Sequence, residues 1–207
     1  MKVFEFGSLR FRPIEKDDLK LLHGWENDFE LMMFSRSKPM SFTNMAQLER
    51  QYEEWVKDEK TLRFMVELLP KNEPIGIAKI EREEWGNVRS ANVGTYIGNK
   101  GLWGKGIGRQ ISVALLEMSF VQLNMERCEA FSVEYNKRAH RVLESCGFKK
   151  AGVMRQSNFV GGRKWDSYCF DILREEYLAL RTKLLKQVLG DGLEGYLKRI
   201  DPTKCRS

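Results

Sequence analysis

A glycine-rich segment in the middle of the chain decides the fold. It reads Tyr96-Ile97-Gly98-Asn99-Lys100-Gly101-Leu102-Trp103-Gly104-Lys105-Gly106-Ile107-Gly108-Arg109. Five glycines fall within the eleven residues 98–108. Glycine lets the backbone turn tightly and lets a ligand approach N–H groups closely. Because the segment joins a predicted strand to a predicted helix, its N–H groups and the positive end of the helix dipole suit a phosphate.

Two better-known phosphate loops do not match this segment. A P-loop requires G-x-x-x-x-G-K-[ST], but Gly104-Lys105 is followed by Gly106. The dinucleotide fingerprint G-x-G-x-x-G requires a final glycine where this chain has Arg109 or Ile111. A simple turn between strand and helix remains the alternative, although Lys105 and Arg109 add positive charge at the same place.

The positive charge of the chain is concentrated around the same segment. The 207 residues carry 35 Lys+Arg and 29 Asp+Glu, a net of +6. Residues 99–164 hold 12 basic and 5 acidic side chains, whereas residues 1–98 are net −2. This local excess favours a compact anionic partner, with a solvated basic face as the alternative. No aromatic RNA-binding motif accompanies it, so we expect no nucleic-acid partner.

Length and composition favour one domain with a sizeable core. The hydrophobic content is 42%, and no apolar run approaches the roughly 20 residues that span a bilayer. The charged N-terminus does not resemble a secretory signal, so we expect a cytoplasmic protein with reduced thiols. The cysteines are scattered at Cys128, Cys146, Cys169 and Cys205. With two histidines besides, they predict no metal site.

Hydrophobic periodicity predicts a mixed α+β domain rather than a doubly wound one, because three meandering strands precede a long helix. The predicted strands are residues 9–12, 62–69, 75–82, 90–97, 128–133, 148–153 and 164–173. The predicted helices are residues 19–25, 29–34, one capped by Thr43, 109–123, 137–145 and 175–189. Gly147 is expected to end a helix in the left-handed region, and Gly161-Gly162 to form a hairpin turn.

A second motif follows about thirty residues after the glycine segment. Asn136-x-x-Ala139 is followed by Gly147-Phe148, and the closing stretch runs from Gly161 to Tyr168. Together with the glycine segment, these motifs resemble the Gcn5-related N-acetyltransferase (GNAT) superfamily. They are most similar to its branch of ribosomal-protein N-terminal acetyltransferases. The resemblance covers about residues 8–178.

The resemblance implies both a fold and an activity. The fold would be a mixed sheet with splayed strands flanked by helices, in a domain of residues 1–174, with residues 175–207 as a helical extension packed on it. The activity would be transfer of the acetyl group of acetyl-CoA to a primary amine by direct attack in a ternary complex. The acceptor would be a protein N-terminus, a polyamine or an aminosugar. No metal is implied, and a homodimer is possible.

The resemblance also assigns the coenzyme contacts by position. Tyr96, Ile97 and Gly98 would contact the pantetheine arm, with the Ile97 N–H polarising the thioester carbonyl. Asn136 would bind the pantetheine or a water, and Arg138 would reach the 3′-phosphate or stay solvated. The pyrophosphate loop would comprise Trp103, Gly104, Lys105, Gly106, Ile107, Gly108 and Arg109.

The family's usual acid and base are missing at their expected positions. Many members place a tyrosine seven residues after the motif asparagine, where this chain has Leu143. The branch's serine and glutamate correspond to Ala139 and Asn158.

Other residues therefore become the candidates for catalysis. Tyr135, Asn136 and Glu81 are nominated as catalytic residues. A carboxylate would take the amine proton directly or through water, and Glu83 and Glu84 are alternatives to Glu81 for this role. The acidic segment 26–30 is expected near the acceptor, where it would attract a cationic amine, with an ordinary polar start of a helix as the alternative. An acyl-CoA sensor with degenerate catalysis is the alternative function.

Overall fold

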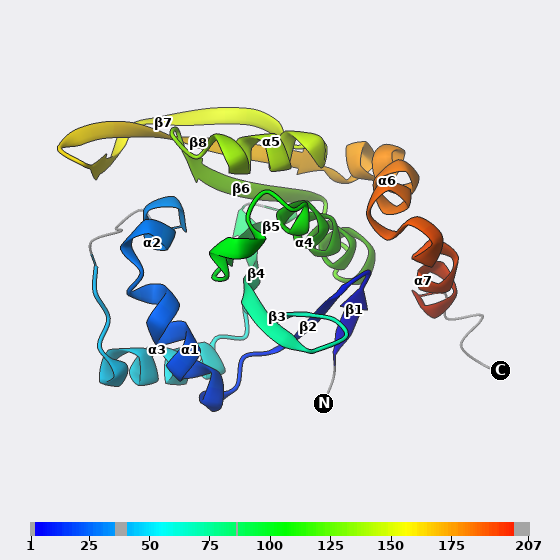
Figure 1. Ribbon diagram of the computed structural model, residues 1–207. Helices are drawn as coiled ribbons and strands as arrows, with labels where there is room; N and C mark the ends of the chain where they lie inside the picture. The colour runs from blue at the N-terminus through cyan, green and yellow to red at the C-terminus, as the bar shows by residue number, and fades with distance from the viewer. Residues whose placement is uncertain (1–2, 36–40, 86, 201–207) are drawn as a thin grey trace.

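The computed structural model describes residues 3–35, 41–85 and 87–200. Eight strands form one sheet in the order β1-β2-β3-β4-β5-β6-β8-β7 (Figure 1). The strands are β1 (Phe4–Phe6), β2 (Leu9–Pro13), β3 (Thr61–Leu68), β4 (Glu73–Trp85), β5 (Val88–Ile97), β6 (Arg127–Val133), β7 (Lys149–Val160) and β8 (Arg163–Leu173). All neighbours are antiparallel except β5 and β6, which confirms the mixed α+β class.

Helices cover both faces of the sheet. They are α1 (Leu19–Glu26), α2 (Phe29–Ser35), α3 (Met45–Lys57), α4 (Ile107–Glu117), α5 (Lys137–Ser145), α6 (Arg174–Leu189) and α7 (Leu193–Ile200). Side chains of β4 alternate between the two faces of the sheet and so contribute to two hydrophobic cores. Ile80 belongs to the core that holds α4, and Ile77 packs against the core under α1 and α3. Within the described ranges, no helix is both long and apolar enough to cross a bilayer.

The sheet opens between its two parallel strands. Pairing of β5 with β6 stops at Asn92 and Glu129, although the strands continue to Ile97 and Val133. Their unpaired ends diverge and leave room beside the start of α4. This confirms the splayed strands that the family resemblance implied.

Several local details differ from the sequence predictions. Asn44, not Thr43, caps α3, because its side chain accepts a hydrogen bond from the Gln47 N–H at 2.9 Å. β7 runs on to Val160, and residues beyond 192 form a further helix. The left-handed end at Gly147 is confirmed, with φ of +96°. Cys205 lies outside the described residues.

The C-terminal helices share the main core. Tyr177, Leu184 and Leu185 of α6 and Tyr196 of α7 are all buried in it. These contacts attach the segment after residue 174 to the sheet and to α4. The division of the chain into 1–174 and an extension of 175–207 stays a prediction.

Candidate active site

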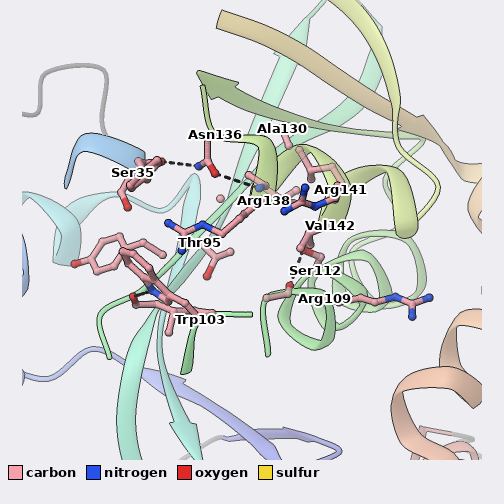
Figure 2. A pocket seen from close by; sticks show the side chains of 18 of the residues that line it. Ser35, Thr95, Trp103, Arg109, Ser112, Ala130, Asn136, Arg138, Arg141 and Val142 are labelled. Atoms are coloured by element: carbon pink, nitrogen blue, oxygen red, sulfur yellow. Dashed lines mark hydrogen bonds between the residues drawn. The ribbon is translucent and has the colours of Figure 1, made fainter. Parts of the chain in front are cut away.

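A pocket of about 500 Å³ lies where β5 and β6 separate (Figure 2). The ends of these strands form its floor through Val93–Ile97, Ala130 and Phe131. The glycine segment, α4 and α5 form one wall, and the end of α2 forms another. The fold therefore brings the two sequence motifs to one cavity.

The start of α4 is shaped for an anion. Gly104 and Gly106 have φ of +76° and +82°, and a Cβ added to either would meet no atom within 4 Å. Gly106 is the N-cap of α4 and provides no side-chain cap. Because the first N–H groups of a helix lack intrahelical acceptors, this turn offers open donors to a phosphate.

Trp103 fastens the glycine segment to the end of β5. Its Nε1–H donates to the Ile97 carbonyl at 2.9 Å, and its ring stands edge-on to the Phe34 ring of α2. Gly98 is required by packing, because a Cβ there would lie 2.2 Å from the Trp25 ring. Tyr96 and Ile97 line the pocket. The role of the Ile97 N–H toward the thioester stays a prediction.

Three arginines contribute free positive charge to the pocket. Arg109, Arg138 and Arg141 line it, and none forms a salt bridge with a carboxylate of the described residues (Figure 2). The Arg138 guanidinium lies 4.2 Å from the centre of the Trp103 ring, a cation–π contact that fixes its place. Arg141 was missed by the sequence analysis, although its spacing of three from Arg138 places both on one face of α5. The arrangement suits a ligand with several phosphates.

Two loop residues lie slightly apart from this pocket. Lys105 and Ile107 line a neighbouring hollow, which shares Gly106 and Arg109 with the main pocket. Gly108 lines the main pocket itself. The loop residues nominated from the sequence are thus distributed over two adjoining surfaces.

Tyr135 and Asn136 hold the C-terminal end of α2 by hydrogen bonds, and we call this pair of contacts a latch. The Tyr135 hydroxyl donates to the Met33 carbonyl at 2.6 Å, and Asn136 Nδ2 donates to the Phe34 carbonyl at 3.0 Å. These carbonyls belong to the last turn of α2, which has no intrahelical donors for them. Asn136 Oδ1 also accepts from the Ala139 N–H at 3.1 Å and so caps α5. Asn136 lines the pocket, and burial raises the pKa of Tyr135.

The remaining catalytic candidates are dispersed. Leu143 lines the pocket and has no proton to give. Glu81 does not line the pocket; it forms an ion pair with Lys79 at 2.6 Å on β4. Asn158 is buried and donates to the Ser167 hydroxyl at 2.6 Å.

Removing the Tyr135 hydroxyl tests whether this residue is a latch or an acid. Tyr135→Phe is expected to lower the free energy of unfolding by about 1 kcal/mol, the net value of one hydrogen bond. It should lower kcat less than tenfold, since the hydroxyl is engaged by α2. Urea unfolding and steady-state kinetics measure both quantities. Tyr168→Phe is the control, because it deletes a hydroxyl that has no partner among the described residues. A kcat loss above a hundredfold with unchanged stability would make Tyr135 the acid.

The sheet splays beside the start of α4, where N–H groups are open to a ligand, and arginines without carboxylate partners line the gap. This arrangement is that of an acyltransferase that takes acetyl-CoA. The family model described as the acetyltransferase (GNAT) domain matches residues 8–149. The chain belongs to this family and is an acetyl-CoA-dependent N-acetyltransferase.

Similar proteins include spermidine acetyltransferases. The spermidine N(1)-acetyltransferase of Vibrio cholerae is 29% identical over 172 residues, which cover 83% of this chain and 96% of that protein. Its namesake from Escherichia coli K12 is 23% identical, over 83% of this chain and 89% of that protein. A crystal structure of spermidine N-acetyltransferase from Vibrio cholerae in complex with CoA and spermine has a TM-score of 0.74 and 28% identity, covering 83% and 98% of the chains.

These relatives refine two of the predictions. They are named as acetyltransferases, which gives no support to the sensor alternative. They are also not evidence for the ribosomal-protein branch, so that finer resemblance stays a prediction. Among the described residues, no group of His, Cys, Asp and Glu is arranged to hold a metal ion.

Proposed function

We propose that this protein transfers the acetyl group of acetyl-CoA to a primary amine of a polyamine. The similarity to spermidine acetyltransferases supports this choice of acceptor. The observation that carries it for this chain is a difference in charge between the two sides of the splayed strands. The coenzyme side holds arginines without carboxylate partners, whereas the opposite face of the sheet carries carboxylates.

The carboxylates form a row across the sheet. Glu81 of β4 pairs in register with Asn92 of β5, which pairs with Glu129 of β6, which pairs with Asp171 of β8. Residues directly opposite in neighbouring strands share one face. Ile80, next to Glu81, belongs to the core that holds α4, so the row occupies the face of α1 and α3. It lies where β5 and β6 begin to separate.

Cations of the chain already balance this row. Lys79 pairs with Glu81 at 2.6 Å, and Arg127 contacts both Glu129 and Asp171, at 2.9 and 3.0 Å. Lys149 of β7 faces Asp171 in register, so three cations stand beside three carboxylates and the row is balanced in charge, unlike the positive coenzyme side. A face rich in carboxylates accepts ammonium groups more readily than the positive coenzyme side does.

Part of the acidic segment 26–30 lies beside the residues that follow β5. Asp28 and Glu30 both contact Lys100 Nζ at 2.8 Å, which joins α2 to the segment after β5. Through these pairs the pKa of Asp28 is lowered and that of Lys100 is raised. The segment therefore helps to hold α2 in place and adds negative charge that Lys100 partly neutralises.

The chemistry is a direct acyl transfer. The nitrogen lone pair of a neutral amine attacks the thioester carbon, the C–N bond forms, and the C–S bond breaks to release the coenzyme thiolate. A primary amine has a pKa near 10, so a proton must be removed at neutral pH. No carboxylate of the described residues lines the pocket, and Glu81 would act through water. The chain's main contribution is to hold the thioester and the amine within reach of each other.

Release of coenzyme A with a panel of amines tests the proposed acceptor. Spermidine is expected to give a kcat/KM at least tenfold above a peptide N-terminus or an aminosugar. A monoamine of similar length is the matched control, since it keeps the nucleophile and lacks the further ammonium groups. Preference for the peptide or the aminosugar would overturn the polyamine assignment. Binding of acetyl-CoA without turnover of any amine would overturn the activity itself.

A further inference from the structure

Helix α6 lies beyond the segment that matches the family model, yet it packs against α4. Its buried side chains Tyr177, Leu184 and Leu185 join the main core. Helix α4 begins at the phosphate-binding turn. Any residue that α6 presents near that turn therefore has a fixed place relative to the coenzyme.

One buried carboxylate anchors α6 to the far end of α4. Glu117 is fully buried and accepts two hydrogen bonds from Arg181, at 2.6 and 2.9 Å. The Tyr177 hydroxyl also donates to it, and the Tyr196 hydroxyl of α7 donates at 2.8 Å. Charge-assisted, bidentate bonds of this kind restrict both orientation and position. The anchor removes the freedom of α6 to slide along α4.

The other end of α6 reaches the coenzyme site. Arg109 Nη2 donates to Gln187 Oε1 and lies 3.5 Å from the Ser145 carbonyl. In Figure 2 the Arg109 side chain extends away from Arg138 and Arg141, on the side of the C-terminal ribbon. Arg109 and Gln187 also line the hollow beside the loop, which measures about 570 Å³.

The neutral side chain of Gln187 leaves the positive charge of Arg109 in place. A carboxylate at this position would pair with Arg109 and cancel its charge. The amide oxygen of Gln187 accepts the same hydrogen bond and leaves the full positive charge available to a phosphate. Arg109 forms no salt bridge with any carboxylate in the described part of the chain.

We infer that Gln187 is a positioning residue for coenzyme recognition: it holds the Arg109 guanidinium at the phosphate-binding turn without neutralising it. The C-terminal extension is then part of the coenzyme site. Its effect should be confined to the nucleotide end of the coenzyme, because the acyl arm would occupy the gap between β5 and β6, as the family resemblance implies. This inference concerns the coenzyme and does not depend on which amine is acetylated.

The test compares acetyl-CoA with acetylpantetheine, which lacks the nucleotide and its phosphates. Gln187→Ala is expected to raise KM for acetyl-CoA three- to tenfold, with kcat at saturation and kcat/KM for acetylpantetheine unchanged. Gln187→Glu should raise KM for acetyl-CoA more than tenfold, since it neutralises Arg109. Thr182→Ala, at another exposed position of α6, is the matched control and should change neither substrate.

A double-mutant cycle identifies the path of the effect. In an Arg109→Ala background, Gln187→Ala should cost nothing further. Additive losses would show that Gln187 does not act through Arg109 and would overturn the inference. So would an unchanged KM for acetyl-CoA in Gln187→Ala, or equal losses with acetylpantetheine. Melting temperatures of the unliganded variants check that each one is folded.

Discussion

Glu117→Ala is expected to lower the free energy of unfolding by about 3–5 kcal/mol, the range for breaking a buried ion pair from one side. The substitution leaves Arg181 and two tyrosine hydroxyls without their acceptor inside the core. Burial and the Glu117 carboxylate raise the pKa values of Tyr177 and Tyr196, so both hydroxyls stay protonated donors. Urea unfolding followed by circular dichroism measures the loss.

Two further variants define what the Glu117 result means. Glu117→Gln keeps an acceptor oxygen and loses the charge, so its loss should fall between those of the wild type and the alanine variant. Glu194→Ala removes an exposed partner of Lys198 in α7 and should change stability little. If Glu117→Ala cost no more than Glu194→Ala, the idea of a buried anchor would be wrong.

Local signals explain why much of the fold was predictable. Asn136 caps α5 and Gly147 ends it in the left-handed region, so both bounds of Lys137–Ser145 follow from neighbouring residues. The hairpin at Gly161 is equally local. The cap of α3 was placed one residue early because Thr43 and Asn44 are both good caps, and local propensity does not choose between them.

The residues that organise the site are joined over long distances in the sequence. Tyr135 binds the carbonyl of Met33, 102 residues earlier, and Glu117 binds Tyr196, 79 residues later. No periodicity or spacing encodes such pairs, because they depend on how packed elements meet. The sequence therefore predicted that Tyr135 and Asn136 lie near the coenzyme, but not that they hold the end of α2.

Helix α4 connects the glycine turn to the Glu117 anchor. Helix α4 carries at its first residues the glycine turn that we expect to bind phosphate, and at its last residue the Glu117 anchor. A loss at Glu117 should therefore appear mainly as lost stability, whereas a change at the first turn should appear mainly as lost coenzyme affinity. Comparing the two kinds of variant therefore distinguishes residues of α4 that stabilise the fold from residues of α4 that bind the coenzyme.

Gly106→Ala is expected to raise KM for acetyl-CoA at least tenfold while the protein remains folded. An L-residue at φ of +82° costs about 1 kcal/mol, and the new Cβ would occupy open space where a phosphate must approach the N–H groups. Gly162→Ala is the matched control, because Gly162 has φ of +73°, equally open space and a place in the β7–β8 hairpin.

Gly162→Ala introduces the same backbone strain at a position away from the coenzyme site. Both variants should therefore lose similar stability, and only Gly106→Ala should lose affinity for the coenzyme. Calorimetric titration with coenzyme A and urea unfolding separate these quantities. Wild-type affinity for coenzyme A in both variants would show that the phosphates do not rest on the first turn of α4. A loss of affinity in both would trace the effect to strain rather than to obstruction. A loss of coenzyme affinity in Gly106→Ala but not in Gly162→Ala would show that Gly106 lies at the pyrophosphate, since backbone strain and free space are matched at the two positions.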